Sequence, residues 1–119
     1  MKWYLAKVVY RIICGDGNHT AQFDEQLRWI LAADEGEAFD KATEIGCSEA
    51  ETFYNNKQEL VQWQFVNVPE VYRLSKLIDG AEIYSRINEV EDAEAYTTFV
   101  HSKAGSIQDN QIQQLQNLI

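Results

Sequence analysis

Apolar side chains recur at every second position in the segment from residue 2 to residue 14. The odd positions mix apolar residues, among them Trp3, Leu5 and Val9, with two basic ones. The even positions form an unbroken apolar row: Tyr4, Ala6, Val8, Tyr10, Ile12 and Cys14. A period of two is that of a β-strand, whose successive side chains point to opposite faces of a sheet. The pattern predicts a long central strand, covered fully on one face and at least half on the other.

A turn-forming run, Gly15–Asn18, ends this strand. A second alternation follows over residues 23–33, with apolar side chains at every odd position except Glu25 and polar ones at three of the even positions between them. This pattern predicts a second strand and therefore a β-hairpin. We expect Trp29, on the odd row of that strand, to be buried against Ile45 or Phe39 of a following helix.

That helix has a start signal at Asp34, whose side chain can cap the free amides of its first turn. Glu37, three residues later, can reach back in a capping box. Gly46 is a candidate terminator, and Ser48 is a candidate restart that would extend helical structure toward residues 53 and 54.

A third strand is predicted over residues 60–68, with a slip in its alternation between Phe65 and Val66 that suggests a β-bulge. Pro69 has no amide hydrogen, which places it at an edge or a bend. Apolar runs over residues 71–78 and 81–87 flank Asp79 and Gly80, a combination typical of a tight hairpin.

These elements predict an α+β domain over residues 1–103. Its core would be a four- to five-stranded antiparallel sheet in ββαββ order, with the bent hairpin last and the helices packed on one face. A right-handed crossover would place the third strand beside the first, giving the strand order second, first, third, fourth.

A second helix is predicted over residues 92–103, followed by a Gln-rich amphipathic tail over residues 104–119. The tail carries a narrow apolar stripe of Ile112, Leu115 and Leu118. A helix this short is marginal alone in water. We therefore expect it to be helical only when docked, with Gly105 as a hinge.

Composition limits the class of protein. The 119 residues carry 10 basic and 19 acidic side chains, a net charge of −9, and the basic residues are scattered. Nucleic-acid and anionic-membrane partners are therefore disfavoured. Apolar runs are too short to span a bilayer, no signal-peptide cleavage pattern follows the first strand, and we expect a cytoplasmic protein. Cys14 and Cys47 are expected to be buried, reduced thiols.

Residue types that could carry chemistry are present, but their spacing is poor. Cys14 and His19 lie near two acids at the first turn without paired metal-ligand spacing, so no metal is expected. Ser85 and His101 lack a nucleophile elbow, so no catalytic residues are assigned. Glu82, Tyr84 and Arg86 would share one face of the last predicted strand and form the best candidate ligand site, although a solvated strand face explains them equally simply. No cofactor is expected.

Four segments together resemble a known family: Lys2–Lys7, the helix from Ala38 to Gly46, Trp63–Val66 and Gly80–Ile87. The resemblance is to the small prokaryotic domain of unknown function 4288 family, and it covers roughly residues 1–99. It implies a stand-alone bacterial domain with no established activity and brings no catalytic residues with it.

Three hypotheses on function follow. The first is a non-catalytic protein-interaction module that self-associates, most simply as a homodimer, with Trp3, Leu5, Val9 and the tail stripe as interface candidates. The second is a small ligand-binding domain or enzyme that uses Glu82, Tyr84 and Arg86. The third is an acidic inhibitor or immunity-type protein that binds a basic partner.

Overall fold

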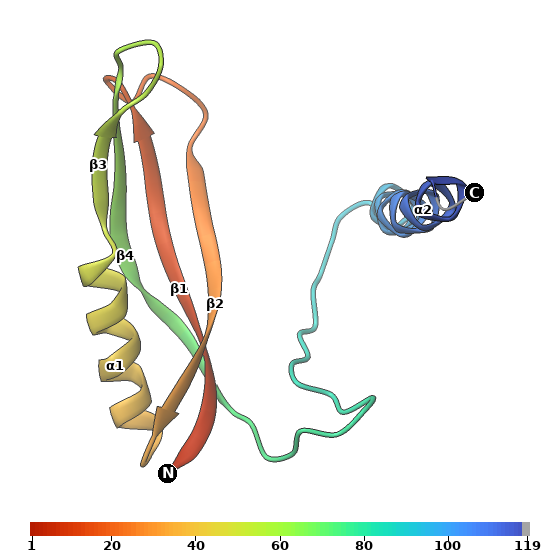
Figure 1. Cartoon of the computed structure of the whole chain (residues 1–119), viewed down its shortest axis with the longest axis horizontal. Helices are drawn as coiled ribbons and strands as arrows, with labels where there is room; N and C mark the ends of the chain where they lie inside the picture. The colour runs from red at the N-terminus through yellow and green to blue at the C-terminus, as the bar shows by residue number, and fades with distance from the viewer. Residues whose placement is uncertain (118–119) are drawn as a thin grey trace. The chain divides into compact units, whose positions relative to one another are not determined.

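The structure, a computed structural model, describes residues 1–117 (Figure 1). The chain divides into two compact units, Met1–Tyr84 and Ser85–Ile119. The first unit contains four strands and one helix, and the second contains one long helix. Their bounds are β1 Lys2–Cys14, β2 Gln22–Ala32, α1 Glu35–Ser48, β3 Glu51–Tyr54, β4 Leu60–Arg73 and α2 Ala93–Asn117.

All four strands join one antiparallel sheet in the order β2-β1-β4-β3 (Figure 1). The α+β class, the ββαββ order and the central place of β1 confirm the sequence predictions. The outer place next to β4 belongs to β3, where the sequence suggested a restarted helix; that interpretation was wrong. The Asn55 side chain explains the turn, because its Oδ1 accepts from the amides of Lys57 and Glu59 at 2.9 and 3.0 Å and so folds β3 back onto β4.

Helix α1 begins where the capping signals predicted. The amide of Glu37 donates to Oδ1 of Asp34 at 2.8 Å, and the Glu37 carboxylate accepts from the amide of Ala33 at 3.2 Å. The helix packs on the face of the sheet that carries the even row of β1. Tyr4, Ala6, Val8 and Tyr10 are buried there with Ala38 and Ala42 of the helix.

Gly46 does not end α1, which continues to Ser48. The glycine is required by packing, because a Cβ at this position would overlap Cε1 and Cδ1 of the Phe65 ring. The close approach also lets the Tyr10 hydroxyl donate to the carbonyl of Gly46 at 2.9 Å, a bond that is buried. These contacts tie the end of the helix to β1 and β4.

Strand β4 extends to Arg73 and is irregular in two places, opposite the β1 segment Lys7–Tyr10. One irregularity skips Val66, which confirms the predicted bulge, and the other includes Pro69. The predicted hairpin strands beyond β4 are absent: residues 74–92 contain no strand. Only the tight turn survives, with Gly80 at a φ of 81° and a 3.1 Å bond from the Ala81 amide to the Ile78 carbonyl.

The segment after β4 lies against the sheet instead of extending it. The Leu74 amide donates to the Trp3 carbonyl at 2.9 Å. Side chains from residues 74–83 enclose, together with Trp29, a small apolar cavity of about 150 Å³. Tyr84 meets Tyr72 of β4 edge to face, with ring centroids 5.1 Å apart. Leu77, Ile78 and Ile83 nevertheless stay more than half exposed, so the segment contacts the sheet face opposite α1 only locally.

Trp29 is not in the core: it is 53% exposed, so the expected contact with Ile45 or Phe39 is wrong. The reason is the register of the hairpin, in which Leu5 faces Trp29. Odd positions of β2 therefore share a face with odd positions of β1, and α1 packs on the other face. Trp29 instead meets the Trp3 ring edge to face at 6.1 Å.

The second unit is built around α2, which Asp92 caps by accepting from the Ala95 amide at 3.0 Å. The helix runs unbroken through Gly105, so the predicted hinge at that residue is wrong. The predicted domain boundary between residues 103 and 104 stays a prediction. None of its described residues is buried, and Tyr96, Phe99 and Ile107 are exposed. Within residues 1–117, neither helix combines the length and the apolar character needed to cross a lipid bilayer.

Candidate functional site

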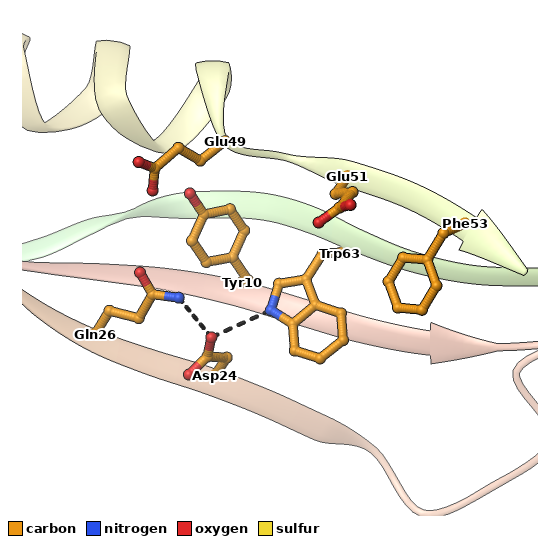
Figure 2. Close-up of a pocket in the computed structure, with 7 residues that line it drawn as sticks. All are labelled: Tyr10, Asp24, Gln26, Glu49, Glu51, Phe53 and Trp63. Carbon is orange, nitrogen blue, oxygen red and sulfur yellow. Dashed lines mark hydrogen bonds between the residues drawn. The ribbon is translucent and has the colours of Figure 1, made fainter. Parts of the chain in front are cut away.

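A pocket of the first unit lies on the α1 side of the sheet, just beyond the C-terminal end of that helix (Figure 2). The helix covers the half of this face nearest the start of β1 and leaves the other half open. The pocket has a volume of about 370 Å³. Its lining comes from all four strands and the residue after α1: Tyr10, Asp24, Gln26, Glu49, Glu51, Phe53 and Trp63.

Asp24 is the best-held carboxylate of this pocket. Its Oδ2 accepts from the side-chain amide of Gln26 at 2.6 Å and from the Trp63 indole N–H at 3.1 Å, as the dashed lines in Figure 2 show. The Trp63 ring in turn stacks on Phe53, with centroids 6.3 Å apart and planes 23° from parallel. One wall of the pocket is thus a pair of aromatic rings fixed against a carboxylate.

Two further carboxylates give the pocket its negative charge. Glu49 forms an ion pair with Arg28, a residue that also donates to Gln26. The Glu51 side chain makes no hydrogen bond or ion pair within residues 1–117. Burial, with the charge of Glu49 adding to it, raises the pKa of the Tyr10 hydroxyl. Three carboxylates against one guanidinium leave the site net negative.

The chemistry of this lining suits a positively charged group. Carboxylates attract a cation directly, and the faces of Trp63 and Phe53 carry the negative part of the aromatic quadrupole. Its lining residues include no serine, cysteine or histidine, and its acid–base groups are the three carboxylates and the Tyr10 hydroxyl.

A second candidate surface lies on the opposite face and at the edge of the sheet. Within the described residues 1–117, no strand pairs with the outer side of β2. Its odd side chains project from the face that α1 does not cover, and three of them are more than half exposed: Phe23, Leu27 and Trp29. We refer to these three residues as the β2 apolar row. Exposed apolar surface of this kind, on an unpaired strand, is typical of an interaction site.

The ligand residues predicted from the sequence were grouped because they would share one strand face, and the structure has no strand there. Glu82, Tyr84 and Arg86 do not share a strand face, because residues 81–87 form no strand. Glu82 and Tyr84 belong to the first unit and Arg86 to the second. Tyr84 instead packs on Tyr72. Their binding of a ligand stays a prediction without a geometric basis.

The interface candidates of β1 have different surroundings. Trp3 is nearly half exposed and Val9 is half buried, but Leu5 is buried, which corrects the expectation of an open surface at that position. Leu5 faces Trp29 on one side and Tyr72 on the other, so neighbouring aromatic residues cover it.

The tail candidates Ile112 and Leu115 are exposed on α2, and Leu118 lies outside the described residues. Their role as an interface was not tested by the structure and stays a prediction.

His19 stabilises the loop between β1 and β2 through hydrogen bonds of its imidazole ring. The Cys14 amide donates to Nε2 of His19 at 3.0 Å, and the second ring nitrogen of His19 bonds the Thr20 carbonyl at 2.8 Å. Both nitrogens of the imidazole therefore close the loop. Cys14 is half buried and Cys47 exposed, and both are free, so the expectation of two buried thiols is wrong at both positions.

Sequence reasoning missed the acidic pocket because its residues come from five separate segments. Asp24 and Gln26 read as the outward face of a half-buried strand. A signal was nevertheless present: if odd positions of both hairpin strands share one face, the even row of β2 places Asp24 beside the even row of β1, close to Tyr10. The exposed β2 apolar row follows from the same register.

Comparison with known proteins gives one result. No curated protein and no solved structure matches the chain. The family described as "Domain of unknown function (DUF4288)" matches residues 3–85, which are more than half of the chain and nearly coincide with the first compact unit. On that match, the protein belongs to the DUF4288 family.

Proposed function

We propose that this protein is a non-catalytic interaction module that associates with a second copy of itself through strand β2. The observation that carries the proposal is the combination of an unpaired edge and the β2 apolar row. Phe23, Leu27 and Trp29 are 55%, 57% and 53% exposed. Removal of these apolar side chains from water by a partner lowers the free energy of the complex.

The composition of β2 supports this proposal. Soluble proteins protect a sheet edge with proline, charged side chains, bulges or short strands. The 11 residues of β2 include the charged Asp24, Glu25 and Arg28 but neither proline nor lysine, and their pairing with β1 continues without a register shift. The other edge strand, β3, has only four residues and begins with Glu51. Of the two edges, β2 is the longer and is therefore better suited to recruit a partner.

Light scattering over a concentration series tests the proposal. We expect the wild-type mass to rise from 13.7 kDa toward twice that value at micromolar concentrations. Leu27→Glu keeps a favourable neighbour in Lys7, which lies opposite on β1, but places a charge in the β2 apolar row. It should weaken association about tenfold, as for a loss of roughly 1.4 kcal/mol.

The matched control is Val66→Glu, because Val66 is 52% exposed but lies on β4, away from the edge. This variant should associate like the wild type. A monomer mass for the wild-type protein at every concentration would contradict the proposal, and so would equal weakening by both substitutions.

A second candidate function is recognition of a basic partner, and the acidic pocket favours it. A lysine or arginine side chain from a protein partner would find three carboxylates and two aromatic faces there. NMR titration with an arginine-containing peptide should shift the indole resonance of Trp63. The substitution Glu51→Gln, which removes the carboxylate without an intramolecular partner, should weaken the shift. No shift at millimolar peptide would exclude this function for the pocket.

A further inference from the structure

The register of a β2–β2 contact can be worked out from the sequence of the strand. Two identical antiparallel edges are related by a twofold axis perpendicular to the sheet. Such an axis passes midway between the two copies of one residue, which we call the centre. Each residue before the centre then faces the residue equally far after it in the partner. Each possible centre therefore makes a definite set of cross-strand pairs, and opposite charges favour a pairing whereas like charges disfavour it.

Charge excludes several centres near the middle of β2. A centre at Asp24, Glu25 or Arg28 would place an ionised side chain directly against its own copy. A centre at Leu27 avoids that repulsion, but it sets Glu25 against the partner's Trp29 and leaves Asp24 opposite an isoleucine. None of these arrangements places Asp24 opposite a basic residue.

A centre at Gln26 makes a favourable pair on each face of the sheet, and it sets Glu25 opposite the partner's Leu27. On the α1 side, Asp24 lies opposite the partner's Arg28, and the same pair forms again on the other side of the axis. On the uncovered face, Phe23 lies opposite the partner's Trp29, also twice. Gln26 faces its own copy, and an amide can both donate to and accept from another amide.

The side chains have bonding capacity left for these pairs. Only Oδ2 of Asp24 accepts hydrogen bonds within residues 1–117, from Gln26 and Trp63, so Oδ1 is available to a partner. Nη1 of Arg28 makes a single long bond of 3.4 Å, to Glu49. A cross-strand pair between Asp24 and the partner's Arg28 would therefore add to the existing network without breaking it.

We infer that two copies of the chain pair their β2 strands antiparallel with Gln26 on the twofold axis, which joins two four-stranded sheets into one of eight strands. The inference rests on the proposed self-association and specifies its partner and register. Because the paired edge is continuous, the acidic pockets of the two copies lie on the same face of the joined sheet.

Symmetric disulfide formation tests this register in the full-length chain. Cys14→Ala and Cys47→Ala first remove the native thiols, and single cysteines then replace Glu25, Gln26 or Leu27. Residues facing each other across antiparallel strands have Cα atoms about 4.5–5.5 Å apart, within the range that a disulfide spans. Residues one position away from the axis lie about 8 Å from their own copies, beyond that range.

We expect Gln26→Cys to form an intermolecular disulfide under mild oxidation at least tenfold faster than Glu25→Cys or Leu27→Cys. The oligomer mass of each reduced variant is measured in parallel. A dimer that links fastest through residue 25 or 27, or through none of the three, would overturn the register and leave self-association intact. A monomer mass for the reduced parent that lacks native cysteines, and for the wild type, would overturn both.

Discussion

The two faces of the sheet are built from the same strands but differ in what covers them. On one face, Tyr4, Val8 and Tyr10 are buried under α1, and the open end of that face carries the acidic pocket. On the other face, the β2 apolar row stays more than half exposed although its residues are equally hydrophobic. Hydrophobicity alone therefore does not place a residue in the core, because the position of a single helix decides which face is buried. The uncovered face is where a partner gains most by binding.

The largest effect that separates the two faces should come from deleting one aromatic side chain on each. Tyr10→Ala removes a ring that is 1% exposed and should cost about 3–5 kcal/mol of unfolding free energy. Phe23→Ala, on the uncovered face, should cost about 1 kcal/mol, since most of its surface is already in water. Urea denaturation at submicromolar concentration, where association is weakest, measures both. Equal losses would mean that the face assignment is wrong.

Packing between α1 and the sheet is tight, and substitutions at two glycines test this. Gly46→Ala should cost about 1–3 kcal/mol, because the new methyl group overlaps the Phe65 ring and the core must shift.

Gly105→Ala is the matched control, since Gly105 is also helical and no atom outside its own helix lies within 4 Å of a Cβ built there. It should stabilise α2 by up to about 1 kcal/mol. Circular dichroism in urea reports both changes, and a neutral Gly46→Ala would contradict the close approach of helix and sheet.

The smallest effect is a pH dependence that originates on the covered face. Burial and the charge of Glu49 raise the pKa of Tyr10 above its ordinary value of 10.0. The folded protein therefore holds the phenol proton more tightly than the unfolded chain does. This contribution to stability is complete below pH 10 and is lost as the pH rises through the folded-state pKa.

Tyr10→Phe isolates that contribution. The urea midpoint of the wild type should fall more steeply between pH 9.5 and 11.5, roughly the range about the phenol pKa, than that of the variant. Parallel curves would show that Tyr10 ionises equally easily in both states.

Local sequence signals predicted the fold where they agreed with each other. The alternation of Lys2–Cys14, the cap at Asp34 and the bulge near Val66 all depend on neighbours along the chain, and all were confirmed. The failures arose where apolar patterns have two explanations. Residues 74–84 alternate like strands but form none, and the short strand β3 is visible only through its pairing with β4.

The candidate sites were harder to predict than the fold because they depend on register. Asp24 and Trp63 are 39 positions apart, and no local pattern joins them before the strand order is known. The exposed state of Trp29 depends in the same way on which face α1 selects. By contrast, the grouping of Glu82 with Arg86 assumed a strand that does not form.

Hydrogen exchange of the β2 backbone amides tests the central claim most directly. Amides of β2 that point toward β1 are bonded within the chain, and the alternate amides point away from it. If a second copy pairs with this edge, the outward amides between Phe23 and Trp29 should become at least tenfold more protected as the protein concentration rises through the association range. Outward amides that exchange at the same rate at every concentration, in a protein whose inward amides are protected throughout, would contradict the account.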